Sequence, residues 1–111
     1  MSVVGGSMGG WAAATAASVA QAHEIDRLVL LAPSPVDHPE RVAGRKLYVI
    51  ARDDPNANGT PRLVRLREQY EQVPEPKELV ILEGSAHAQF LFATDQGERL
   101  MNEIVRFLSA P

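Results

Sequence analysis

The sequence predicts an α/β fold: a short parallel sheet of about four strands, flanked by helices. Three observations support this class. Short apolar runs rich in β-branched residues are bounded by proline, glycine or charged residues, as in strands buried on both faces. The longer stretches between them are rich in alanine or carry apolar residues at helical spacing. The two kinds of segment alternate, which is typical of parallel strands joined by right-handed crossovers.

Four segments are expected to form strands. The first looks like the end of a strand, and the other three are apolar runs that stop at proline, at charged residues or at glycine. These runs are too short for buried helices, which usually need at least about 10 residues. The strands are expected at residues 2–4, 28–32, 47–51 and 79–82.

Three segments are expected to form helices. The first is rich in alanine, the best helix former. Thr60-Pro61 gives the second an N-cap and a first-turn proline. Asp95, with Glu98 three residues later, gives the third a cap-like start. The helices are expected at residues 11–22, 61–73 and 95–108, and residues 33–44 form a loop with a helical turn.

Composition limits the class of protein. The 111 residues suit one domain, residues 1–111, and 45% hydrophobic with 23% charged residues is ordinary for a globular chain. A net charge of −3 argues against nucleic-acid binding, which favours a basic patch. No apolar run approaches the roughly 18 residues of a membrane helix. The absence of cysteine excludes disulfides, thiolate metal sites and cysteine nucleophiles, and fits a reducing compartment.

The N-terminal segment has one feature of a secretory signal and lacks the others. Ala20-Gln21-Ala22 has the small-residue pattern of a cleavage site. The 22 residues up to this point contain no lysine or arginine, and their middle is mostly glycine and alanine. A signal peptide needs a basic start and a strongly apolar centre. We therefore expect a cytoplasmic protein.

The segment with the most chemical information is Gly5-Gly6-Ser7-Met8-Gly9, a G-x-S-x-G pattern between a strand and a helix. A serine on such a tight turn needs an unusual backbone conformation, and Gly5 and Gly9 are expected to leave room for neighbouring backbone. The Ser7 hydroxyl would then stand exposed at the carboxyl end of the sheet. The backbone N–H of Met8 would point at an oxyanion. Alone, the pentapeptide also suits a flexible glycine-rich turn.

Other glycine motifs fail on their spacing. A dinucleotide-binding G-x-G-x-x-G would need glycine at Ser7 or Met8. A phosphate-binding loop begins well with Gly5 and Gly10, but Trp11 and Ala12 replace its lysine and hydroxyl residue. The serine-centred interpretation is therefore favoured.

Two later strands are followed by side chains that could activate such a serine. Asp53 and Asp54 follow the strand at 47–51, and His87 follows the strand at 79–82. A nucleophilic serine needs a base, and the base needs an orienting acid. Singly, the aspartates also suit a turn before proline, and His87 suits a hydrogen-bonded loop. The three residue types after successive strands together favour a triad.

These segments resemble the C-terminal half of an α/β-hydrolase of the serine esterase and peptidase kind. Residues 4–10 resemble the nucleophile elbow of that family, and the order serine, aspartate, histidine is the family's order. Residues 47–54 resemble the strand that ends in the acid, and residues 82–87 resemble the loop that presents the histidine.

The resemblance also assigns roles to single residues. In the family the acid commonly lies three residues past a small residue that ends the strand, so Ala51 indicates Asp54, with Asp53 as the second choice. Ala88 departs from the family pattern, because glycine often follows the histidine.

The resemblance implies a serine hydrolase that cleaves carboxylic esters or related acyl bonds of a small-molecule substrate. Ser7 would attack the carbonyl, His87 would take and return the proton, and Asp54 would orient His87. The Met8 N–H would supply part of the oxyanion hole. No cofactor, metal, nucleic acid or membrane is expected to take part.

The resemblance also leads to an alternative. The family sheet usually has eight strands, and this sequence resembles the last four. The second oxyanion donor and much of the acyl pocket would then lie outside it. The alternative is a truncated, weakly active or inactive module whose first strand forms an exposed edge. That edge would pair with a second copy or with an N-terminal half.

Two further patterns have less support. Residues 54–59 match the opening of a calcium-binding loop, but loop position twelve, which needs an acid, is Arg65. Arg62, Arg65 and Arg67 lie near Lys77, and glutamates at positions 68, 71, 75 and 78 intermingle with these cations, which indicates a solvated helix face and not a phosphate-binding patch.

Overall fold

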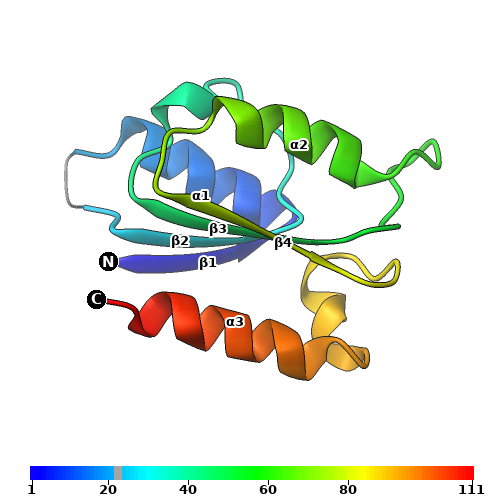
Figure 1. Ribbon diagram of the computed structural model, residues 1–111. Coiled ribbons are helices and arrows are strands. Elements are labelled where there is room, and N and C mark those ends of the chain that lie inside the picture. Colours follow the sequence, from blue (N-terminus) through cyan, green and yellow to red (C-terminus); the bar gives the residue numbers. More distant parts are fainter. Residues whose placement is uncertain (22–23) are drawn as a thin grey trace.

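A computed structural model describes residues 1–21 and 24–111 and has a four-stranded parallel sheet with helices on both faces (Figure 1). The strands lie side by side in chain order, which confirms the predicted fold class. The strands are β1 (Ser2–Gly6), β2 (Arg27–Leu31), β3 (Arg45–Ala51) and β4 (Lys77–Leu82). The α-helices are α1 (Met8–Val19), α2 (Arg62–Gln72) and α3 (Gly97–Ser109), and short 3-10 helices span Pro39–Arg41 and Ala88–Ala93.

The helices lie in two layers. In Figure 1, α1 and α2 cover one face of the sheet, and α3 covers the other. All neighbouring strands are parallel, so their carboxyl ends meet at one edge of the sheet. This arrangement brings the segments that follow β1, β3 and β4 together.

The core is built around the two central strands. The apolar residues of β2 and β3 are almost completely buried because helices cover both faces of the sheet. Helix α1 faces the sheet with small side chains, which allow close approach. Its buried residues are Gly10, Ala13, Ala14 and Ala17.

Two expected helix starts are wrong in detail. Thr60 does not cap α2. Its N–H donates to the side-chain oxygens of Asn56 and Asn58, which ties it to the preceding loop. Pro61 occupies the N-cap position instead, with no side-chain cap. The third helix begins two residues after Asp95, and the N-cap residue Gln96 also makes no side-chain cap bond.

The first helix also differs from its expected range. It starts at Met8, directly after the serine, and ends at Val19. Ala22, the expected end, lies outside the described residues. Within residues 1–21 and 24–111, no helix combines the length and apolar content required to cross a bilayer.

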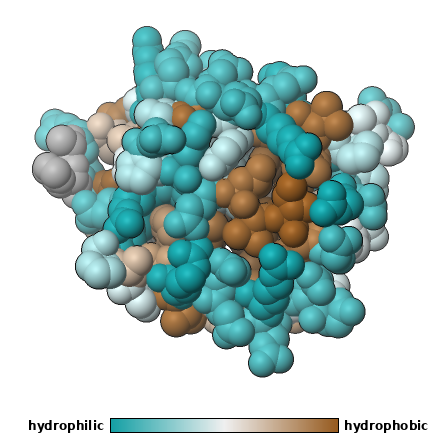
Figure 2. All heavy atoms as spheres, viewed as in Figure 1, coloured by the Kyte–Doolittle hydropathy of each residue, from teal (hydrophilic) through white to brown (hydrophobic). Residues whose placement is uncertain are grey.

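The two edges of the sheet differ in exposure. Strand β4 forms one edge, and its residues 79–81 are only partly buried. Figure 2 has the same viewpoint as Figure 1 and shows an apolar patch near the centre of the visible face. In Figure 1, β4 crosses in front of the sheet in this region. Strand β1 forms the other edge and leaves the Val4 side chain 51% exposed.

Candidate active site

Ser7 lies on the turn that joins β1 to α1. Its φ of 55° and ψ of −116° fall in a region that non-glycine residues rarely adopt, at a cost of about 1–3 kcal/mol. Backbone hydrogen bonds hold the turn: the Ser7 N–H donates to the Leu31 carbonyl at 2.9 Å, and the Ser34 N–H donates to the Ser7 carbonyl at 3.1 Å. Ser7 stands at the N-cap position of α1, but its hydroxyl makes no cap bond and is free to serve another partner.

Close packing explains two of the glycines around Ser7. A Cβ at Gly5 would lie 2.5 Å from the Gly9 carbonyl oxygen, so only glycine fits there. At Gly9 itself a Cβ would meet nothing within 4 Å, in contrast to the expected crowding. The second close approach occurs at Gly10 instead, where a Cβ would lie 2.7 Å from the Pro33 Cβ. The backbone of Gly9 passes close to Gly5, and its own side-chain position faces open space.

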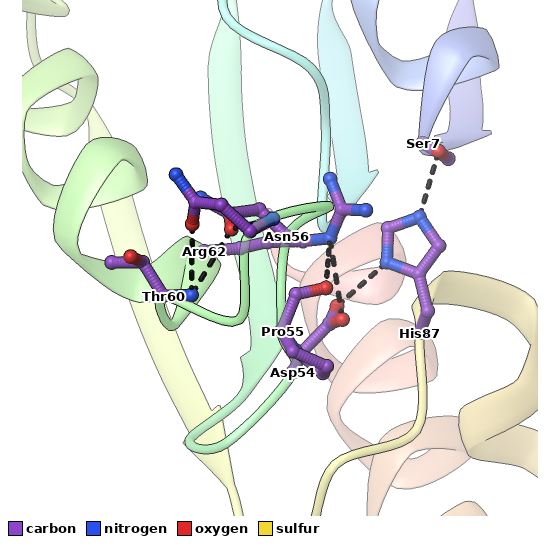
Figure 3. A network of polar contacts seen from close by, with 8 residues as sticks. Ser7, Asp54, Pro55, Asn56, Thr60, Arg62 and His87 are labelled. Atoms are coloured by element: carbon purple, nitrogen blue, oxygen red, sulfur yellow. Dashed lines mark hydrogen bonds and ion pairs between the residues drawn. The ribbon is translucent and has the colours of Figure 1, made fainter.

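The structure brings the predicted serine, histidine and acid into one hydrogen-bonded chain (Figure 3). The His87 Nε2 atom lies 2.8 Å from the Ser7 hydroxyl, and His87 Nδ1 lies 2.6 Å from Asp54 Oδ2. When Nδ1 carries the ring proton, it donates to Asp54 and leaves Nε2 to accept the hydroxyl proton. This order of contacts is the one that lets a histidine act as a base toward the serine.

Asp54 and Asp53 differ sharply in environment. The Asp54 side chain is 1% exposed, and its other oxygen, Oδ1, lies 3.3 Å from Arg62 Nε. Asp53 is exposed, and its N–H donates to the Gly84 carbonyl. The fold therefore joins only the second of the two aspartates to His87.

Ala88, the residue after His87, has a backbone conformation that glycine adopts more easily than alanine. Ala88 has a φ of 51°, in the left-handed region, and is fully buried. A Cβ at Gly6 would lie 3.3 Å from the Ala88 Cβ. The turn after His87 thus packs directly against the end of β1, next to Ser7.

Solved structures of two hydrolases share this architecture. A dienelactone hydrolase from Anabaena variabilis aligns with 94% of the chain at a TM-score of 0.67 and 20% identity. An esterase from Pyrococcus furiosus aligns with 97% at a TM-score of 0.62 and 15% identity. The chain has the α/β-hydrolase fold. It spans about half the length of those proteins, 45% and 53% respectively. No protein-family model and no curated sequence matches it.

Within this α/β-hydrolase fold, Met8 is the first residue of α1. Its N–H lies in the first helical turn, where backbone N–H groups lack partners inside the helix. The positive end of the helix dipole adds to the attraction for an anion at this position. The Met8 side chain is 75% exposed, so approach to the turn is open on that side.

One member of the polar network, Arg62, is not evident from the sequence. Arg62 was expected on a solvated helix face, but its side chain lies against the acid (Figure 3). Its Nε donates to the Pro55 carbonyl at 3.1 Å and pairs with Asp54, and its backbone N–H donates to the Asp54 carbonyl at 2.8 Å. The only signal in the sequence is that an arginine opens the helix after the acid.

The candidate site residues do not belong to a metal-ligand cluster in the described part of the chain. No group of three or more acidic or histidine side chains there could hold a metal ion. In the calcium-loop pattern, the Asp54 carboxylate already bonds to His87 and Arg62. A cation beside that guanidinium would be repelled.

Proposed function

We propose that this chain carries the nucleophile, base and acid of a serine hydrolase that cleaves carboxylic esters or related acyl bonds. The observation that supports the proposal is the continuous hydrogen-bonded chain from Ser7 through His87 to the buried Asp54. Each of the three follows a different strand, so the sheet positions all of them at one edge.

The reaction proceeds in two steps. His87 Nε2 accepts the hydroxyl proton as Ser7 Oγ bonds to the substrate carbonyl carbon, and the oxygen of that carbonyl becomes an oxyanion near the Met8 N–H. His87 then protonates the leaving alcohol, which gives an acyl-serine. In the second step His87 takes a proton from water, hydroxide adds to the acyl carbon, and Ser7 leaves with the proton restored. Asp54 stabilises the imidazolium in both steps.

A serine-directed probe tests the proposal. We expect wild type to hydrolyse a short-chain nitrophenyl ester and to be labelled by a fluorophosphonate, and Ser7→Ala to lose both. Ser109→Ala, which removes an exposed serine at the end of α3, is the matched control and keeps both. Labelling that persists in Ser7→Ala, or its absence from wild type, contradicts the proposal.

A second candidate function is association through the edge of the sheet. Strand β1 pairs only with β2 among the described residues, and the Val4 side chain is 51% exposed. Unpaired strand edges are templates for pairing with another chain. Light scattering over a range of concentrations tests whether two copies associate, and a constant monomer mass counts against it.

A further inference from the structure

A cavity of about 230 Å³ lies between α1, α2 and the sheet, next to the proposed catalytic residues. Its apolar walls include Ile50 of β3 and Leu66 of α2. Sites for drug-sized ligands usually span about 300–1,000 Å³, so this cavity suits one small group.

Two buried polar side chains line the cavity with unused hydrogen-bonding groups. Tyr48 is 4% exposed and Gln69 is 8% exposed. Gln69 Oε1 accepts the Val36 N–H at 2.9 Å, but the Gln69 amide nitrogen and the Tyr48 hydroxyl have no partner among the described residues. No unpartnered side-chain nitrogen or oxygen in that part of the chain is cut off from solvent. These two groups therefore reach open space, and the space that both residues line is the cavity.

Both groups offer hydrogen bonds to a ligand. The amide nitrogen of Gln69 is a donor only. Burial, and then the neighbouring Tyr70, raises the pKa of Tyr48, so its hydroxyl keeps its proton at ordinary pH. A ligand group that accepts two hydrogen bonds would satisfy both.

The charge of the cavity wall favours an anion. Arg62 and Arg65 line it, and none of the described residues that line it is acidic. Arg65 Nη1 donates to Glu68 Oε2 at 2.9 Å, and its other guanidinium nitrogens have no partner in the described part of the chain. Arg62 turns its Nε toward Asp54 and Pro55, while its two terminal nitrogens point away from these contacts and have no partner among the described residues (Figure 3). Donors, positive charge and apolar walls together fit a carboxylate on a small apolar body.

The cavity adjoins the candidate triad through two of its lining residues. Arg62 touches the acid, Asp54, and the backbone N–H of Ser34 donates to the carbonyl of Ser7. One lining residue therefore separates the cavity from the backbone of Ser7, and another separates it from the carboxylate of Asp54.

We infer that this cavity binds a carboxylate-bearing part of the substrate that Ser7 attacks. The substrate class is then an ester or related acyl compound that also carries a free acid. The inference that the cavity binds a carboxylate depends on the geometry alone. The inference that this carboxylate belongs to the substrate of Ser7 rests on the proposed function.

The first experiment measures binding without turnover. Calorimetry and amide NMR shifts on Ser7→Ala are recorded with benzoate and with its uncharged analogue benzamide. We expect benzoate to bind at least about tenfold more tightly, with shifts around Tyr48 and Gln69. Gln69→Glu keeps the acceptor for Val36 but places a negative charge in the wall, so it should abolish benzoate binding. Equal binding of acid and amide overturns the proposal, whether or not Ser7 is catalytic.

The second experiment compares two esters and two arginines. The kcat/KM of a nitrophenyl ester with a free acid on its acyl chain is divided by that of the uncharged ester of equal length. Arg65→Gln, on the cavity wall, should lower this ratio by about three- to tenfold. Arg67→Gln, on an exposed residue of the same helix outside the cavity lining, should leave it within about twofold. Equal effects of the two variants overturn the substrate role, and failure to cleave either ester contradicts the proposed function instead.

Discussion

Asp53 and Asp54 are chemically identical neighbours that the fold places in opposite environments. The Asp54 carboxylate is buried between His87 and Arg62, and Asp53 lies in solvent. A buried carboxylate is tolerated when it is paired, and the two partners of Asp54 meet that need. Only Asp54 is in a position to set the orientation of the imidazole.

The two aspartates give a matched pair of variants. Asp54→Asn should slow fluorophosphonate labelling of Ser7 by about 10³–10⁴-fold, because an amide in place of the carboxylate favours the wrong histidine tautomer. Asp53→Asn should stay within about twofold of wild type, since its side chain is exposed. The measurement is the labelling rate under excess probe, and similar rates for the two variants would contradict the assignment of the acid.

Lys46 is a buried cation near the start of the central strand β3. Lys46 is 1% exposed, and its Nζ donates to the Pro74 carbonyl at 2.6 Å. Burial, and then the charge of Lys77, lowers the pKa of Lys46 from 10.5 to about 8. Between about pH 8 and 10.5 the unfolded chain therefore holds a proton that the folded chain has lost, and stability rises with pH in that window. Below it, the buried charge costs about 3 kcal/mol.

Replacement of this cation should stabilise the protein in a pH-dependent way. Lys46→Met removes the buried charge but leaves the Pro74 carbonyl without its donor, at a cost of about 1 kcal/mol. We expect a net gain of about 2 kcal/mol in the free energy of unfolding at pH 7, which disappears as the pH approaches 10.5. Urea denaturation of both proteins across this range measures it. A difference that does not change with pH would mean that Lys46 has an ordinary pKa.

At the scale of elements, helix α3 is attached to the sheet through its C-terminal end. Arg27, the first residue of β2, donates from Nη1 to the carbonyls of Phe107 and Leu108 at 3.0 and 2.6 Å, and from Nη2 to the carbonyl of Ala110. The last carbonyls of a helix lack partners and carry partial negative charge, so a guanidinium there satisfies both needs.

Loss of this contact should loosen the end of the helix. Arg27→Gln is expected to lower the free energy of unfolding by about 1–3 kcal/mol and to speed hydrogen exchange at residues 105–110. The matched control is Arg99→Gln, which alters an exposed arginine on the same helix and should change stability by less than about 0.5 kcal/mol. Unchanged exchange at the helix end would show that packing alone holds α3.

The strands could be predicted from sequence more closely than the helix ends. β2 and β3 are buried on both faces, and such strands have continuous apolar runs that are visible in the sequence. The start of α2 depends on contacts that no local pattern shows: the Asn56 side chain takes the Thr60 N–H, and Arg62 is drawn toward Asp54. Loop hydrogen bonds and ion pairs of this kind override capping preferences.

The candidate site also contains some residues that could be predicted from the sequence and others that could not. Ser7 and His87 could be proposed from sequence because a tight turn and a strand end constrain residue type locally. The resemblance favoured Asp54 over Asp53, but the physical difference between them, the burial of one and not the other, cannot be inferred from adjacent identical residues. Tyr48 lies on β3, whereas Arg62 and Gln69 lie on α2, and only the folded chain brings these two elements together around the cavity.

At the scale of the whole molecule, the two edges of the sheet are protected differently. Strand β4 begins with Lys77 and Glu78, and charges of this kind discourage edge pairing. Strand β1 has the sequence SVVGG, with no charged side chain, and pairs only on the β2 side in the described chain. If two copies associate, β1 is therefore the edge at which we expect them to pair.

A charge on β1 should abolish such pairing while leaving the fold intact. Val4 is 51% exposed, so Val4→Lys places an ammonium in solvent beside the unpaired edge, where a second strand would have to desolvate it. Light scattering on wild type should show a mass that rises from monomer toward dimer with concentration, and Val4→Lys should stay monomeric. Val105→Lys, on α3 with a similar exposure of 53%, is the matched control and should behave like wild type. Because strand pairing uses backbone groups and not the α3 surface, equal loss of association in both variants would place the contact away from β1, and a wild type that remains monomeric would rule out pairing at this edge.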